Sequence, residues 1–127
     1  MVLSAEECRA LLERPQVGRV VFTDRALPAV QPVTYIVDDD AIVFWTNDDG
    51  ELARAARDGV LAFEVDEVDP STRTGWSVVV TGLPVHVTTQ VDRSRVGLLL
   101  EPCAPGRRDV LIRIPLTVVA GRRILAA

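Results

Sequence analysis

Polar residues able to bind a charged ligand are concentrated near the middle of the chain. Thr46 and Asn47 offer a hydroxyl and an amide at the end of an expected strand, and Gly50 precedes an expected short helix. The first turn of a helix leaves backbone N–H groups without intrahelical partners, and such groups favour an anion. Because residues of these types also form ordinary turns, the segment indicates either a turn or a phosphate site.

The charges around this segment oppose a phosphate. Asp48, Asp49 and Glu51 are acidic, and a carboxylate beside a phosphate repels it by an energy that distance and screening set. All fourteen basic residues are arginine, so guanidinium groups have to supply any compensating charge. The candidates are Arg54 and Arg57 on the expected helix, and Arg107 and Arg108 in a late loop.

The sequence does not indicate nucleophilic catalysis. Ser77 stands in G-W-S-V, which lacks the G-x-S-x-G pattern of a nucleophile elbow. The single histidine, His86, lies in an apolar strand pattern without a carboxylate or cysteine nearby in sequence. We therefore expect His86 to face the surface or to make a structural hydrogen bond.

A metal site is not indicated either. Cys8 and Cys103 lie far apart without C-x-x-C spacing, and we expect both to be reduced thiols that fill space. Among the acidic residues after position 63, Glu64 and Asp66 recur with the period of a strand, which is typical of a solvated strand face. The other acids of this segment are Glu67 and Asp69.

Length and composition predict one globular domain spanning residues 1–127. The net charge of −4 argues against nucleic-acid binding, because such domains usually carry a basic face. The first residues do not form a secretory signal, and no apolar run has the length of a membrane span. We therefore expect a cytoplasmic protein that does not bind membranes.

Hydrophobic patterns predict a mainly β protein. Strands are expected at 17–23, 29–37, 41–47, 60–69 and 76–87, the last with a bend or bulge at Gly82. A final strand at 110–114 meets an edge or bend at Pro115, and extended sequence continues to residue 124. Short helices are expected between Ser4 and Pro15, at 51–57 and at 92–100. The order of elements predicts a six-stranded antiparallel barrel with helices at its ends.

Five strings in this order resemble the pyridoxamine 5′-phosphate oxidase-like family of FMN-binding split β-barrels, particularly its small bacterial branch. They are V-G-R-V-V-F-T at 17–23, P-V-T-Y at 32–35, F-W-T-N-D-D-G-E-L-A at 44–53, A-F-E-V-D at 62–66 and G-W-S-V-V-V-T-G at 75–82. The resemblance implies a homodimer that binds FMN in two grooves at its interface and acts as an oxidoreductase on a small molecule. Some split-barrel relatives bind a deazaflavin coenzyme in the same groove, and the sequence does not separate the two cofactors.

The resemblance also implies roles for particular residues. Pro32, Val33, Thr34 and Tyr35 would line the isoalloxazine ring, and Trp45, Thr46 and Asn47 would approach the ribityl chain and phosphate. Gly50, Glu51 and Leu52 would complete the phosphate end, while Trp76 and Ser77 would reach the flavin of the other subunit. Many relatives carry Lys or Arg where this chain has Glu51.

Two alternatives remain open at this point. Trp45 and Trp76 are large aromatic residues, which are as typical of a core or a dimer interface as of a flavin site. The acidic Glu51 also leaves open a barrel that binds flavin or another ligand without catalysis, or that binds no cofactor.

Overall fold

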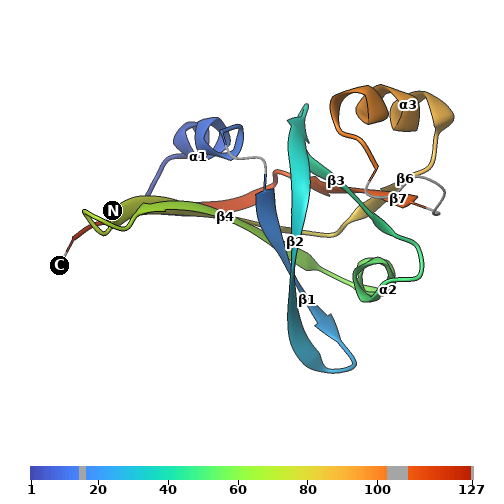
Figure 1. Ribbon diagram of the computed structural model, residues 1–127, viewed down its shortest axis with the longest axis horizontal. Helices are drawn as coiled ribbons and strands as arrows, with labels where there is room; N and C mark the ends of the chain where they lie inside the picture. The colour runs from blue at the N-terminus through green and yellow to red at the C-terminus, as the bar shows by residue number, and fades with distance from the viewer. Residues whose placement is uncertain (15–16, 103–108, 127) are drawn as a thin grey trace.

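The computed structural model describes residues 1–14, 17–102 and 109–126, in which eight strands and three helices form a curled antiparallel sheet with helices around it (Figure 1). The mainly β fold, an antiparallel half-barrel with short helices, is as predicted. The helices are α1 (Ala5–Leu12), α2 (Glu51–Asp58) and α3 (Gln90–Leu99). The strands are β1 (Val17–Asp24), β2 (Leu27–Asp38), β3 (Ala41–Asn47), β4 (Leu61–Asp69), β5 (Thr74–Gly82), β6 (Val85–Val87), β7 (Asp109–Pro115) and β8 (Val118–Ile124).

The sheet has the order β6-β7-β3-β2-β1-β4-β5-β8. Each edge strand is joined through a short connection to a strand near the opposite edge, because β6 follows β5 and β8 follows β7. This connectivity requires the sheet to curl. Figure 1 shows α1 over one end of the curled sheet and α3 over the other end, beside β3 and β7.

The predicted number of six strands is wrong, because two long strands are each divided at a bend. The expected strand 76–87 breaks at Gly82 and Pro84, so that β5 pairs with β8 while β6 pairs with β7. The last segment breaks between Pro115 and Val118 into β7 and β8. Proline cannot donate a ladder hydrogen bond, which accounts for both interruptions.

The first predicted helix forms where its cap specifies it. Ser4 and Glu7 make the expected reciprocal capping box on α1, with hydrogen bonds of 3.1 and 3.2 Å. Cys8 and Leu12 of α1 are buried, and the Tyr35 hydroxyl donates to the carbonyl oxygen of Leu12 at 2.6 Å. This bond ties the end of α1 to the middle of β2.

The core has two parts, one on each face of β3. Phe44 and its alternate neighbours face the interior of the half-barrel, where Tyr35 and Phe44 pack around Phe63. Val43 and Trp45 face the other way and form a second cluster with Val96 of α3. β3 is therefore buried on both faces.

Gly18 is required by close packing between β1 and β4. A Cβ atom at this position would lie 2.3 Å from Cζ of Phe63, whose ring lies flush against the strand. The G in V-G-R-V-V-F-T therefore has a structural role in the core of the half-barrel.

We expect Gly18→Ala to lower the free energy of unfolding by about 1–3 kcal/mol, because the fully buried Phe63 ring has to shift. Gly97→Ala on α3 is the matched control, since a Cβ atom there would meet nothing within 4 Å. It should stabilise by up to about 1 kcal/mol through helix propensity. Urea denaturation of both variants measures the difference, and equal stabilities would contradict this packing.

Candidate functional site

The sheet is split between β2 and β3. Residues 27–34 of β2 pair with β1, whereas residues 35–38 pair with β3, and the pairing of β2 with β3 ends at Tyr35 and Phe44. Beyond this point no described strand pairs with the β3-facing edge of β2, and residues 45–47 of β3 pair with β7 alone. The split therefore presents backbone N–H and C=O groups of β2 that need partners.

The predicted ring-binding residues of β2 divide between two faces. Pro32 and Thr34 are exposed, whereas Val33 and Tyr35 are buried in the core. This alternation is the ordinary period of a strand. Only Pro32 and Thr34 therefore present side chains to a ligand on the outer face, and Val33 and Tyr35 can contribute through their backbone.

The predicted phosphate end lies where β3 turns into α2. The N–H of Gly50 donates to the carbonyl oxygen of Asn47 at 3.2 Å, and Gly50 is the N-cap of α2 without a side-chain capping bond. Glu51 is exposed on the first turn, while Leu52 is fully buried in the core. Thr46 is also buried, so its hydroxyl is not on the protein surface.

Trp45 is used by the second core cluster. Its ring is 4% exposed beneath α3, its Nε1 donates to the carbonyl oxygen of Leu100 at 2.8 Å, and the Arg93 guanidinium lies 5.1 Å from the ring centroid. Since Trp45 and Thr46 point to opposite faces of β3, one ligand cannot contact both side chains from the same side. This placement corresponds to the alternative in which Trp45 fills the core.

Trp76 and Ser77 lie on β5, away from the other predicted residues. Trp76 is 5% exposed in the core, whereas Ser77 is half-buried on the outer face. β1 and β4 lie between β2 and β5, which separates Pro32 from Ser77 by roughly 14 Å at the usual strand spacing. One protomer does not bring these two residues together.

The arginines of α2 are engaged by carboxylates. Arg54 donates to Asp24 at 2.9 Å, and Arg57 donates to Asp48 at 2.8 Å. Arg57 thus neutralises one acid of the turn, while Asp49 and Glu51 have no ion-pair partner in the described ranges. The other predicted candidates, Arg107 and Arg108, lie outside the described residues.

Among the residues that the structure describes, two buried side-chain oxygen atoms at the end of β3 lack hydrogen-bond donors. Asn47 and Asp109 are directly opposite each other on β3 and β7. Oδ1 of each side chain is buried and accepts no hydrogen bond from the residues that the structure describes. An unpaired buried acceptor is costly, so this position suits a group that donates hydrogen bonds.

The outer face of β1, β2 and β4 combines apolar side chains with a charged cluster. Val17, Val21 and Val30 are 38–60% exposed, and Arg19 between them donates to Glu64 at 3.0 Å and Asp66 at 3.1 Å. Burial, followed by the neighbouring Asp66, raises the pKa of Glu64. Glu64 and Asp66 lie outward as expected, but they are partly buried and paired instead of simply solvated.

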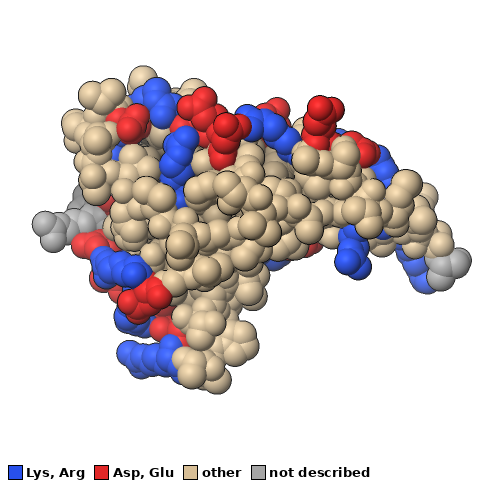
Figure 2. Space-filling model, turned by 180° about the vertical axis from the view of Figure 1, so that it is seen from behind, with Lys and Arg blue, Asp and Glu red and all other residues tan. Residues whose placement is uncertain are grey.

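A broad uncharged surface is visible on the back of the molecule (Figure 2). It extends from the body of the sheet down to the projecting β1–β2 hairpin. Charged groups are gathered along the upper margin of the view and along its lower left margin. On the hairpin itself, Leu27 and Val30 are 69% and 60% exposed. Exposed apolar side chains that gather on one surface are typical of protein interfaces.

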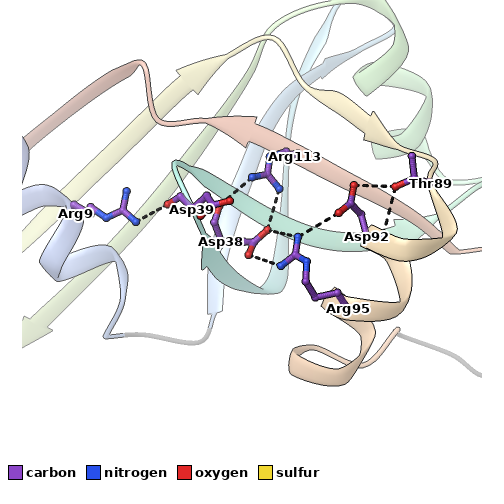
Figure 3. A network of polar contacts seen from close by, with 7 residues as sticks. All are labelled: Arg9, Asp38, Asp39, Thr89, Asp92, Arg95 and Arg113. Atoms are coloured by element: carbon purple, nitrogen blue, oxygen red, sulfur yellow. Dashed lines mark hydrogen bonds and ion pairs between the residues drawn. The ribbon is translucent and has the colours of Figure 1, made fainter.

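A second polar cluster holds α3 against the sheet (Figure 3). The carboxylate of Asp38, at the end of β2, accepts two hydrogen bonds from Arg95 at 2.7 and 2.9 Å and one from Arg113 at 3.0 Å. Arg95 also lies 3.6 Å from Asp92, which accepts from the N-cap Thr89. Hydrogen bonds from Arg95 are the main reason that the pKa of Asp38 is lowered to about 2.

The cavity beside this cluster has a volume of about 420 Å³ and is lined in part by His86, Arg95 and Arg113. Both guanidinium groups already pair with Asp38, so they do not make the cavity a strong anion site. His86 is half-buried on β6, and its Nε2 has no hydrogen-bond partner in the described part of the chain. We expected His86 either to face the surface or to make a structural hydrogen bond. Among the described residues, its Nε2 atom does neither.

Other predicted features are placed as follows. Cys8 is buried, and Gly121 leaves room for its sulfur atom. A Cβ atom added at Gly121 would come within 2.6 Å of Sγ of Cys8. Cys103 lies outside the described residues. No group of three or more His, Cys, Asp or Glu side chains within the described ranges could hold a metal ion. No helix in the described part of the chain has the length and apolar character needed to cross a membrane.

Comparison with known proteins shows the class to which this split half-barrel belongs. The model of the family described as pyridoxamine 5′-phosphate oxidase matches residues 4–123. The chain is 39% identical over 129 residues to the uncharacterized protein Rv0080 of Mycobacterium tuberculosis, covering 98% of this chain and 85% of that protein. The chain belongs to the pyridoxamine 5′-phosphate oxidase family, as the five strings predict.

Solved structures of similar proteins have the same fold over their full length. The FAD-binding protein from Mycobacterium smegmatis superposes with a TM-score of 0.80 at 29% identity, covering 98% of both chains. An FAD-binding protein from Mesorhizobium loti superposes with a TM-score of 0.77 at 26% identity, covering 97% of this chain and 96% of that one.

We expect Asp38→Asn to lower the free energy of unfolding by about 2 kcal/mol at pH 7, since the folded protein lowers the pKa of this carboxyl from 3.8 to about 2. The contribution is fully present above about pH 4 and is lost as the pH falls through about 2. Urea denaturation at several pH values measures it. Asp40→Asn is the control, because the Asp40 side chain is 96% exposed and should matter little. Equal effects of both substitutions would contradict the stabilising role of the hydrogen bonds from Arg95 and Arg113 to Asp38.

Proposed function

We propose that this protein is a flavin-dependent oxidoreductase that binds its flavin in the split between β2 and β3. The observation that carries the proposal is the unpaired edge of β2 in a chain of this family. Two structural relatives of full coverage, named as FAD-binding proteins, support the cofactor class. The flavin would supply hydride transfer to or from a small organic substrate or a nicotinamide donor.

The backbone of β2 is suited to orient the ring. Amide N–H and C=O groups alternate along the edge that faces the split, and the edge of an isoalloxazine ring carries both acceptors and a donor. Pro32 and Thr34 would bound the ring on the outer face. The turn from Asn47 to Gly50 would hold the ribityl chain and its terminal group. In FMN, the cofactor that the family resemblance implies, this terminal group is the phosphate.

We further propose that the functional unit is a homodimer formed through the outer face of β1, β2 and β4. Val17, Val21 and Val30 provide apolar surface there, and the Arg19 cluster lies among them. A second subunit would also bring its Ser77 to a ring held near Pro32, which one protomer does not. Trp76 would act only through the core that supports Ser77, since its ring is buried.

The first test is flavin binding. We expect the purified protein to bind flavin and to retain the bound flavin's visible absorption, with a dissociation constant below about 100 μM, which is roughly −5 kcal/mol. Addition of NADH or NADPH under nitrogen should bleach that absorption if the protein catalyses hydride transfer. Absence of binding at about 100 μM would contradict the proposed function.

The second test concerns the dimer. Val30→Glu should give a monomer in analytical ultracentrifugation, because it places a charge in the proposed apolar interface. Leu98→Glu is the matched control, since Leu98 is 89% exposed on α3, whose buried Val96 packs with residues of β3 and β7. A dimer that persists in Val30→Glu but is lost in Leu98→Glu would move the interface to α3.

A binding module without catalysis is the second candidate, favoured by the acids at the start of α2. A module of this kind would bind flavin, or the deazaflavin coenzyme that some split-barrel relatives use, without accepting a hydride. Titration with both cofactors, followed by the nicotinamide reduction test, separates the oxidoreductase from a module that binds flavin and from a module that binds the deazaflavin coenzyme. We place the protein in the cytoplasm, and expect no nucleic-acid partner given the net charge of −4.

A further inference from the structure

The outer face of the sheet continues past β4 to the edge strand β8. The strand registers place one residue from each strand side by side in rows across this face. One row consists of apolar side chains and a single threonine, and from β2 to β8 its members are Val30, Val21, Ala62, Thr81 and Val118. Val118 is 61% exposed, like Val30 at the other end of the row. The apolar surface proposed for the dimer therefore spans five strands.

The charges on β1 and β4 of this face are unequal in number. Arg19 on β1 donates from a single nitrogen, Nη1, to Glu64 at 3.0 Å and to Asp66 at 3.1 Å. One guanidinium therefore serves two carboxylates, whose side chains are only 25% and 32% exposed. Burial and the neighbouring Asp66 raise the pKa of Glu64, as expected where two like charges share one partner. With both acids ionised, the cluster carries one surplus negative charge.

Arg122 on β8 carries the opposite charge on the same face. It lies directly opposite Ser77 of β5, which in turn lies opposite Asp66 of β4. Arg122 is exposed and makes no ion pair within the described ranges, whereas the guanidinium of the next residue, Arg123, lies 3.9 Å from the carboxylate of Glu7 on α1. Because β5 lies between β4 and β8, the backbones of Asp66 and Arg122 are roughly 10 Å apart. Arg122 therefore leaves its charge unpaired within the protomer.

A second copy of the chain is the partner that this face fits. In a twofold dimer both subunits use the same surface, so each contact between two different residues occurs twice. Such a surface complements itself when it carries surplus charges of opposite sign at separate positions. The outer face meets this condition, because the negative surplus lies on β4 and the unpaired arginine lies on β8. A partner with a purely acidic or purely basic surface would match only one of the two positions.

We propose that Arg122 of each subunit forms an ion pair with the Glu64 and Asp66 carboxylates of the other subunit, and that this reciprocal pairing fixes the register of a twofold dimer. The inference rests on the proposed function, in that the dimer forms through the outer face, and it extends that face from β4 to β8. Each pair of carboxylates then has two guanidinium groups, so the charges balance. Ser77 lies between the two charged positions, so the pairing also brings Ser77 into the interface.

The experiment reverses the charge at each position separately, in Arg122→Glu and in Asp66→Arg. Each variant places like charges opposite each other at both symmetry-related contacts of its homodimer. The dimer dissociation constant should therefore rise about 10- to 100-fold in sedimentation equilibrium. Arg123→Glu is the matched control, because it makes the same change at the next residue of β8, whose side chain lies beside α1 instead. The control should keep the dissociation constant of the unchanged chain.

Mixing the two variants tests whether the pairing joins two subunits. A mixed dimer of Arg122→Glu with Asp66→Arg has opposite charges at both contacts. Native mass spectrometry separates mixed from uniform dimers by mass. It should show the mixed dimer as the main species at concentrations where each variant alone is monomeric. Formation of the mixed dimer also shows that both variants are folded.

The outcomes separate this pairing from the proposed function. An Arg122→Glu variant that dimerises like the unchanged chain would overturn the pairing and leave the dimer intact. Recovery of the dimer only when both substitutions are in one chain, and not in the mixture, would place the contact within one subunit and also overturn the pairing. A chain that is monomeric before any substitution would overturn the proposed dimer together with this inference, while flavin titration of the unchanged chain still tests the oxidoreductase.

Discussion

The structure depends on one constraint, which is that β2 changes its pairing along its length. Its first eight residues pair with β1 and its last four with β3. Because a strand has two edges, the first part of β2 is left with one edge of polar backbone that none of the described strands covers. Water or a ligand has to satisfy those groups. The split, the projecting hairpin and the candidate site all follow from this change of partner.

The helices are positioned around the split by different forces. α2 buries Leu52, Ala53 and Ala56, so packing fixes its N-terminus beside the end of β3. α3 buries only Val96 and is held largely by the polar contacts of Asp38, Trp45 and Arg93. Charge-assisted hydrogen bonds therefore hold α3 in position, whereas apolar burial holds α2 in position. The rigid half-barrel leaves the outer face and the split exposed.

Sequence patterns predicted most of the fold because they are local. Alternation identified the strands, and the Ser4 to Glu7 capping box marked the start of α1. The strand number was wrong because a bend at Gly82 and Pro84 changes partners without ending the extended chain. Alternation could also have separated Trp45 from Thr46, since neighbours on a strand face opposite sides, but the family strings grouped them.

Long-range polar contacts were beyond the sequence. Asp38 is separated by 57 residues from Arg95 and by 75 residues from Arg113, and Arg19 is 45 residues from Glu64. No period or motif connects such pairs, because the topology alone brings them together. The same holds for Asn47 and Asp109, whose unpaired oxygens become visible only once β3 and β7 are paired.

The central claim is that the uncovered edge of β2 contacts the flavin ring. Hydrogen–deuterium exchange of the backbone amides, with and without saturating riboflavin, tests it most directly because riboflavin has no phosphate to contribute. The account predicts slower exchange of the amides in residues 29–35 when riboflavin binds. The amides of β8, which is an edge strand at the other side of the sheet, should change little. Unchanged exchange across 29–35, with protection appearing instead near α3 or β6, would contradict it.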